Sequence, residues 1–100
     1  MMKDKRIDFI NRQLPETELF AQLAEEAAEL AQAALKYRRV IDGRNKTPVT
    51  NIEAVNGFIE ELADVQLCIE ILGFTDETIQ ATVSKIKEQK LSRWVKRLGM

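Results

Sequence analysis

The chain has 100 residues and a formal net charge of −1, with 45% apolar and 31% charged residues. This length suits one small domain spanning residues 1–100. The composition is that of a globular chain and excludes a disordered one. The near-neutral charge argues against broad binding to nucleic acid, so we expect no nucleic-acid partner.

The chain contains one cysteine, Cys68, and no histidine. An intrachain disulfide is therefore excluded, the usual zinc ligand sets are missing, and histidine-dependent nucleophilic catalysis is excluded. Any catalysis has to use carboxylates, lysine or a bound metal. No apolar run approaches the roughly 20 residues of a membrane span, and no apolar stretch follows the charged N-terminus. We therefore expect no membrane partner and no signal peptide, and a cytoplasmic protein.

The hydrophobic periodicity predicts an all-α fold. The first helix is expected over residues 3–13, because Pro15 ends it and suits the start of the next helix. The second is expected over residues 16–40, where alanines and regularly spaced leucines favour a long, closely packed helix. Residues 41–50 form the one clear loop, which glycine, asparagine and proline punctuate.

Capping signals predict where the last two helices begin. Thr50 followed by Glu53 reads as a capping box for a third helix, which is expected to run to Leu72 and stop at Gly73. Thr75 is expected to cap a fourth helix at its N-terminus.

The apolar stripe of the fourth helix shifts between Ile86 and Leu91, so one straight face cannot bury all of it. We expect either a bend there or a tail that packs on a second subunit. A chain of this size builds only a thin core, and the alanine-rich second helix invites a partner. A homodimer or a homotetramer is therefore expected.

Acidic residues recur in the same pattern on the second and third predicted helices. Glu26 and Glu29 are three residues apart, as are Glu61 and Asp64, so each pair shares one helical face. Glu26 and Glu61 also fall within apolar stripes, where an unpaired carboxylate is costly to desolvate or stays protonated. Acid-rich helices are most often solvated faces. Two such motifs on apolar stripes instead favour a site for Mg²⁺ or Mn²⁺ between these helices.

These motifs resemble the MazG-like all-α nucleoside triphosphate pyrophosphohydrolases, a superfamily that includes the dimeric dUTPases. That family carries Glu-x-x-Glu on one helix and Glu-x-x-Asp on the next, and the similarity spans residues 19–72. The resemblance implies a four-helix-bundle-like domain in which the four acids hold Mg²⁺. It also implies cleavage of a ribo- or deoxynucleoside triphosphate to the monophosphate and pyrophosphate, in control of nucleotide pools.

The same resemblance gives a role to Glu25, the acid just before the first metal-binding glutamate. In some relatives this acid is the general base toward the attacking water, which agrees with general acid–base logic. The alternative for Glu25 is an ordinary solvated helix acid.

A triphosphate beside four carboxylates requires positive charge in addition to the metal. The candidate cations are Lys36, Arg39, Arg44, Lys46, Lys85, Lys90 and Arg93. We favour Lys36, Lys85 and Arg93 as phosphate contacts, although a single cation on a helix is more often a solvated surface charge. Gln22 is placed to read a base edge. Trp94 is a candidate for stacking on a base or for a place in the core or an interface.

Two other functions stay open at this point. The chain is alternatively a non-catalytic helical regulatory or interaction module on the same bundle, or a pyrophosphohydrolase for another substrate such as phosphoribosyl-ATP. The basic segment 85–97 reads either as a nucleic-acid patch or as an amphipathic packing helix, and its interleaved apolar residues favour packing. The loop around Arg44, Asn45 and Lys46 is expected to touch the nucleotide.

Overall fold

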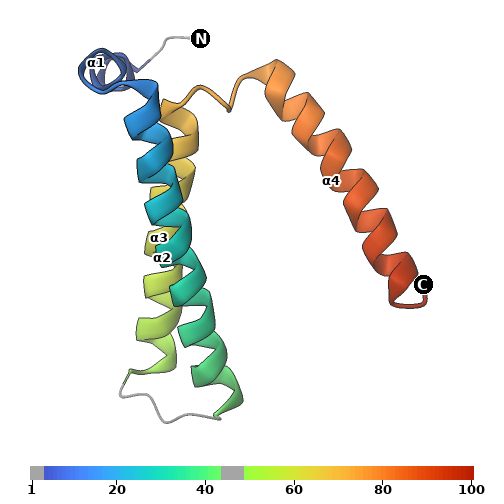
Figure 1. Cartoon of the computed structure of the whole chain (residues 1–100). Helices are drawn as coiled ribbons and strands as arrows, with labels where there is room; N and C mark the ends of the chain where they lie inside the picture. The colour runs from blue at the N-terminus through green and yellow to red at the C-terminus, as the bar shows by residue number, and fades with distance from the viewer. Residues whose placement is uncertain (1–3, 44–48) are drawn as a thin grey trace.

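A computed structural model of the chain describes residues 4–43 and 49–100. Within these ranges there are four α-helices and no strand: α1 (Lys5–Gln13), α2 (Glu16–Asp42), α3 (Asn51–Ile71) and α4 (Glu77–Arg97). The predicted all-α class and its four helices are confirmed (Figure 1). No helix in the described part is long and apolar enough to cross a membrane. The predicted helix start at residue 3 and the loop residues Arg44, Asn45 and Lys46 lie outside the described residues.

Side-chain caps fix the N-termini of α3 and α4. Thr50 Oγ1 accepts a hydrogen bond of 3.1 Å from the Glu53 amide, which confirms the predicted cap of α3. For α4 the prediction of Thr75 was wrong, because Asp76 is the cap and its carboxylate accepts a 2.8 Å bond from the Ile79 amide. Aspartate is the stronger N-cap of the two, since it also places negative charge at the positive end of the helix.

Glycines in the left-handed conformation follow the C-termini of α2 and α3. α2 continues to Asp42, two residues beyond its predicted end, and stops at Gly43 with φ +65°. α3 ends at Ile71, and Gly73 has φ +87° in the turn that leads to α4. These backbone angles are strained for residues with a Cβ, so both turns depend on glycine.

The cap assignments predict unequal effects for two identical substitutions. Thr50→Ala is expected to lower the free energy of unfolding by about 1 kcal/mol, because the Glu53 amide loses its acceptor. Thr75→Ala is the matched control and is expected to stay within about 0.5 kcal/mol of the parent chain. Urea unfolding followed by circular dichroism at one protein concentration measures both. Equal losses at the two positions would contradict the assignment.

The helices α2 and α3 form a long antiparallel hairpin, and α1 crosses its end (Figure 1). The Asn11 side chain on α1 donates a 3.0 Å hydrogen bond to the carbonyl of Ile71, which ties α1 to the end of α3. Among the described residues only Leu19, Ala54 and Ile71 are buried. The hairpin is therefore the framework of the fold, although its apolar core is thin.

In contrast, α4 leaves the end of α3 and stands away from the hairpin (Figure 1). The radius of gyration is 17.3 Å, against about 13 Å for a compact chain of this length. The accessible surface is 8514 Å², about 2,700 Å² more than a compact monomer of this size exposes. α4 is also one unbroken helix through Ile86 and Leu91. The shift in its apolar stripe is therefore not taken up by a break, and Trp94 and Leu98 stay 59% and 78% exposed.

Candidate metal centre

The antiparallel hairpin brings three of the predicted acids together. One carboxylate oxygen each from Glu26, Glu29 and Glu61 lies within 4.8 Å of the other two. Glu26 and Glu29 occupy successive turns of α2, and Glu61 faces them from α3. Glu26 and Glu61 are half-buried and Glu29 is exposed. Three of the acids that were predicted from their three-residue spacing therefore converge, with side chains from two helices.

Burial and the close approach of these acids raise the pKa values of two of them. Hydrogen bonding to Glu61, then the charge of Glu61 and burial, raise the pKa of Glu29. Burial is the main reason that the pKa of Glu26 is raised, and the charges of Glu29 and Asp64 add to it. A hydrogen bond of 2.8 Å from Gln22 Nε2 to Glu26 Oε1 opposes this shift. Glu26 and Glu29 therefore hold their protons more tightly than separate carboxylates do.

Two oxygens in this cluster have no hydrogen-bond partner although they are buried: Glu26 Oε2 and Glu61 Oε2. A buried acceptor without a partner is destabilising, and such groups are rare in folded proteins. A cation between the helices would satisfy both oxygens and offset the repulsion among the acids. Because all the converging donors are carboxylate oxygens, they fit a hard cation such as Mg²⁺ or Mn²⁺.

Asp64, the fourth predicted ligand, is half-buried one turn after Glu61 on α3. It is not part of the three-residue group, but its charge raises the pKa of both Glu26 and Glu29. Its carboxylate therefore lies close enough to act on the cluster. Metal ligation by Asp64, as by the other three acids, stays a prediction.

An open groove of about 740 Å³ continues from the acids along the hairpin. Glu29 and Glu61 line one part of it, and Lys36 and Arg39 line another. Lys36 was favoured as a phosphate contact, whereas Arg39 was named only among the wider set of cations. The three-residue spacing between these cations places both on one face of α2 and was the available signal. Gly57 leaves the groove open, since nothing lies within 4 Å of the position that a Cβ would take.

The other predicted site residues lie on two helices, α2 and α4. Glu25 is exposed on α2, beside Glu26 in the sequence. Gln22 is tied to the cluster by its hydrogen bond to Glu26. Lys85 and Arg93 lie on α4, which stands away from the hairpin, so within one chain the structure does not bring them to the acids.

No role at the site was predicted for Cys68, yet this residue adjoins the cluster. Burial raises the pKa of its thiol, and the charges of Glu26 and Asp64 add to the effect. The signal was the four-residue spacing from Asp64, which places both side chains on one face of α3.

Comparison of the chain with known protein families, with characterised proteins and with solved structures gives no match.

The raised pKa values predict that Mg²⁺ stabilises the fold in a pH-dependent way. Because the pKa values of Glu26 and Glu29 are raised from 4.5, the folded chain binds protons more tightly than the unfolded chain. Without metal, stability therefore falls as the pH rises from about 4.5 through the raised values. Mg²⁺ competes with these protons, so the increase in Tm on adding Mg²⁺ should be larger at pH 8 than at pH 5.

Thermal unfolding with and without Mg²⁺ at these two pH values measures this effect. Glu60→Gln is the control, since Glu60 is exposed on the neighbouring position of α3 and its loss should leave the increment unchanged. An increment that is equal at both pH values, or that disappears in Glu60→Gln, would contradict the assignment of the cluster.

Proposed function

We propose that this chain is a Mg²⁺-dependent nucleoside triphosphate pyrophosphohydrolase of the MazG-like type, with Mn²⁺ as an alternative ion. The observation that carries the proposal is the convergence of Glu26, Glu29 and Glu61, two of which have a buried carboxylate oxygen without a hydrogen-bond partner. The same residues carry the sequence resemblance to that superfamily. Geometry and motif therefore support the proposal independently, since the convergence depends on how α2 and α3 pair.

The hairpin offers a residue for each task that this chemistry requires. Glu26, Glu29 and Glu61, with Asp64, would hold the ion, which when bound neutralises phosphate charge and polarises oxygen atoms nearby. Gln22 orients Glu26 through its 2.8 Å hydrogen bond.

The cations of the groove and the exposed Glu25 complete the arrangement. Lys36 and Arg39 would bind the phosphates from the groove that begins at Glu29 and Glu61. Glu25 would accept a proton from the attacking water while the oxygen of that water bonds to the α-phosphorus. The bond between the α- and β-phosphates then breaks, and pyrophosphate leaves with the electron pair of that bond.

A further part of the proposal is the assembly. One copy exposes about 2,700 Å² more than a compact chain of its size, and its α4 has large apolar side chains in solvent. Closing a four-helix-bundle-like domain around the hairpin therefore requires additional helices. A homodimer or a homotetramer of this chain supplies them.

The direct test is pyrophosphate release with Mg²⁺ from a panel of ribo-, deoxy- and modified nucleoside triphosphates, with phosphoribosyl-ATP included. We expect turnover of at least one substrate, and its loss in EDTA with recovery on adding Mg²⁺. No turnover together with no Mg²⁺ binding in calorimetry would overturn the proposal. Mg²⁺ binding without any turnover would instead support a non-catalytic regulatory module on the same hairpin.

A further inference from the structure

One face of α4 combines apolar and cationic side chains. Residues spaced by three, four and seven positions share a face of a helix, and this face is formed by Ile79, Val83, Ile86, Lys90, Arg93, Trp94 and Arg97. Its first half is apolar and its second half is cationic around an aromatic ring, and none of these residues is acidic. The face is largely in solvent, with Ile86 44% and Trp94 59% exposed.

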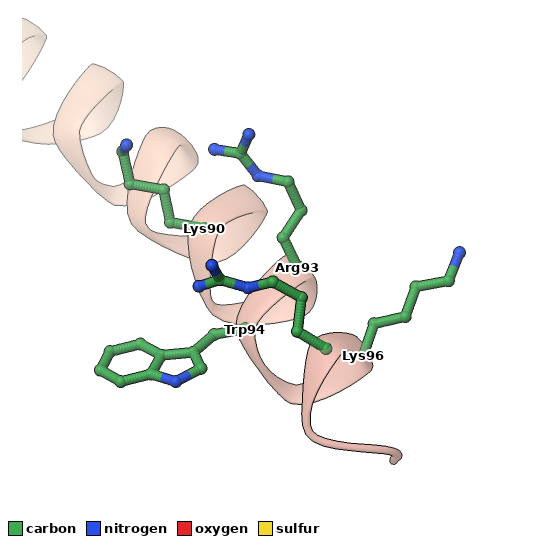
Figure 2. A pocket seen from close by; sticks show the side chains of 5 residues that line it. Lys90, Arg93, Trp94 and Lys96 are labelled. Atoms are coloured by element: carbon green, nitrogen blue, oxygen red, sulfur yellow. The ribbon is translucent and has the colours of Figure 1, made fainter.

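The cationic half of this face has the chemistry of a nucleotide-binding wall. A hollow of about 750 Å³ is lined by Lys90, Arg93, Trp94, Lys96 and Arg97, all from the last turns of α4. Figure 2 shows the Trp94 ring and the charged ends of Lys90, Arg93 and Lys96 projecting from this single helix. An indole ring stacks on a base, and ammonium or guanidinium groups bind phosphates. One helix forms only one wall, so a closed site requires a second.

The hairpin carries the complementary surface. Its acids Glu26, Glu29 and Glu61 have the opposite charge to the α4 face. From Glu26 to Arg39 the acid cluster and groove extend about 20 Å along α2, and from Ile86 to Arg97 the α4 face extends about 16 Å. The two surfaces therefore have similar lengths, and the acidic part of the groove has the opposite charge to the basic end of α4, whereas Lys36 and Arg39 make its other part cationic.

The surplus of exposed surface favours packing of α4 on the hairpin of a second copy. α4 stands away from its own hairpin (Figure 1). The surplus of about 2,700 Å² per chain is well above the approximately 800 Å² per partner that a standard stable interface buries. In a dimer, α4 of each copy would pack on the hairpin of the other copy. The apolar half of the α4 face would then be buried in both copies.

We propose that α4 of one copy packs on the α2–α3 hairpin of a second copy, where Arg93 and Trp94 form the second wall of the groove that begins at Glu29 and Glu61. There Trp94 stacks on the base and Arg93 binds the phosphates of the nucleotide. The packing stands on the surfaces alone, and only the nucleotide contact rests on the proposed function.

The packing is tested without any substrate, because the chain contains a single tryptophan and its fluorescence reports only on Trp94. As the concentration is raised, light scattering should give a doubled mass or a higher multiple. In the same range the emission should shift to the blue and iodide quenching should fall several-fold. A monomer at all concentrations, or an oligomer in which Trp94 stays as open to iodide as in the urea-unfolded chain, would overturn the proposal.

Two variants locate the contact on α4. Ile86→Glu should keep the chain monomeric and Trp94 exposed, because it places a charge in the apolar half of the face. Ser92→Glu adds the same charge at an exposed position outside the three-to-four spacing of that face, and it should associate as the parent chain does. Far-ultraviolet circular dichroism checks that both variants keep the hairpin helices. Association that survives Ile86→Glu would count against this face.

Subunit mixing tests the nucleotide contact. Glu61→Gln and the double variant Arg93→Ala/Trp94→Ala are each expected to be inactive alone. Refolded together, half of their dimers contain both chains, and each such dimer holds one intact site, so turnover should return to about a quarter of the parent value. No recovery would show that α4 serves its own hairpin and would overturn the shared site. If the parent chain shows no turnover, the proposed function and the nucleotide contact are both contradicted. The fluorescence result still decides whether α4 packs on a second copy.

Discussion

Glu61→Gln is expected to lower pyrophosphate release by more than about 100-fold, because even residues behind metal ligands cost 10–100-fold when they are lost. The substitution keeps the side-chain shape and removes one charge from the group of acids that approach within 4.8 Å. It also gives Glu29 a neutral amide as its neighbour in place of the carboxylate that raises its pKa. The effect should therefore be on metal binding and turnover while the fold is retained.

The stability of the metal-free variant separates this explanation from a simple loss of structure. Removing one charge from a crowded acidic cluster should leave the Tm of the metal-free chain unchanged or higher, whereas the increase in Tm with Mg²⁺ should disappear. A variant that melts earlier in EDTA than the parent chain does would show that Glu61 has a structural role, and unchanged turnover would show that it is not a ligand.

A comparison with Glu25→Gln distinguishes the two proposed roles of acids on the hairpin. Glu25 is exposed and lies next to Glu26, and its proposed role is to accept a proton from water. Glu25→Gln should therefore lose turnover but keep the Mg²⁺-dependent increase in Tm. Loss of both would instead place Glu25 among the ligands, and loss of neither would make it the solvated surface acid of the alternative interpretation.

Leu19→Ala is expected to lower the free energy of unfolding by about 3 kcal/mol, through lost burial and the cavity that remains. Leu19 is 5% exposed and one of three buried residues in the described part of the chain. Domains of ordinary size are stable by only about 5–15 kcal/mol, so this one substitution removes a large share. The variant should unfold at a much lower urea concentration than the parent chain does.

Ile52→Ala is the control for this effect, since Ile52 is 72% exposed at the start of α3. Its loss of stability should stay within about 0.5 kcal/mol when both variants are measured at one low concentration. Equal losses at Leu19 and Ile52 would show that the core of the hairpin is not centred on α2 at Leu19.

Much of the hairpin and its acid cluster could be predicted, because short-range spacing determines them. Thr50 and Glu53 mark the start of α3 through a bond between residues three apart. The positions of Glu26 and Glu61 within apolar stripes direct their side chains toward the contact between the helices, and the three-residue spacing places Glu29 on the same face as Glu26. Such signals are local, and helical geometry converts them directly into faces.

The position of α4 could not be predicted in this way. Periodicity tells which face of a helix is apolar, but it does not tell which surface covers that face. Lys85 and Arg93 were therefore expected beside the acids, although within one chain they lie on a helix that stands away from them. Arg39 was not favoured as a phosphate contact, although its three-residue spacing from Lys36 places both cations on one face of α2, where they line the groove.

The isolation of α4 has a consequence for how this helix gains its order. A free helix is held by its own backbone bonds alone, and most helical stability in proteins comes from packing of an amphipathic face. α4 spans Glu77–Arg97 and contains β-branched and serine residues, which weaken a helix that has no partner. In the proposed dimer the folding of α4 would be coupled to its packing on the second copy. The entropy lost in ordering α4 would make the proposed association weaker than its contact area implies. Dilution should consequently unwind α4 and expose its basic end to proteases while the hairpin stays helical.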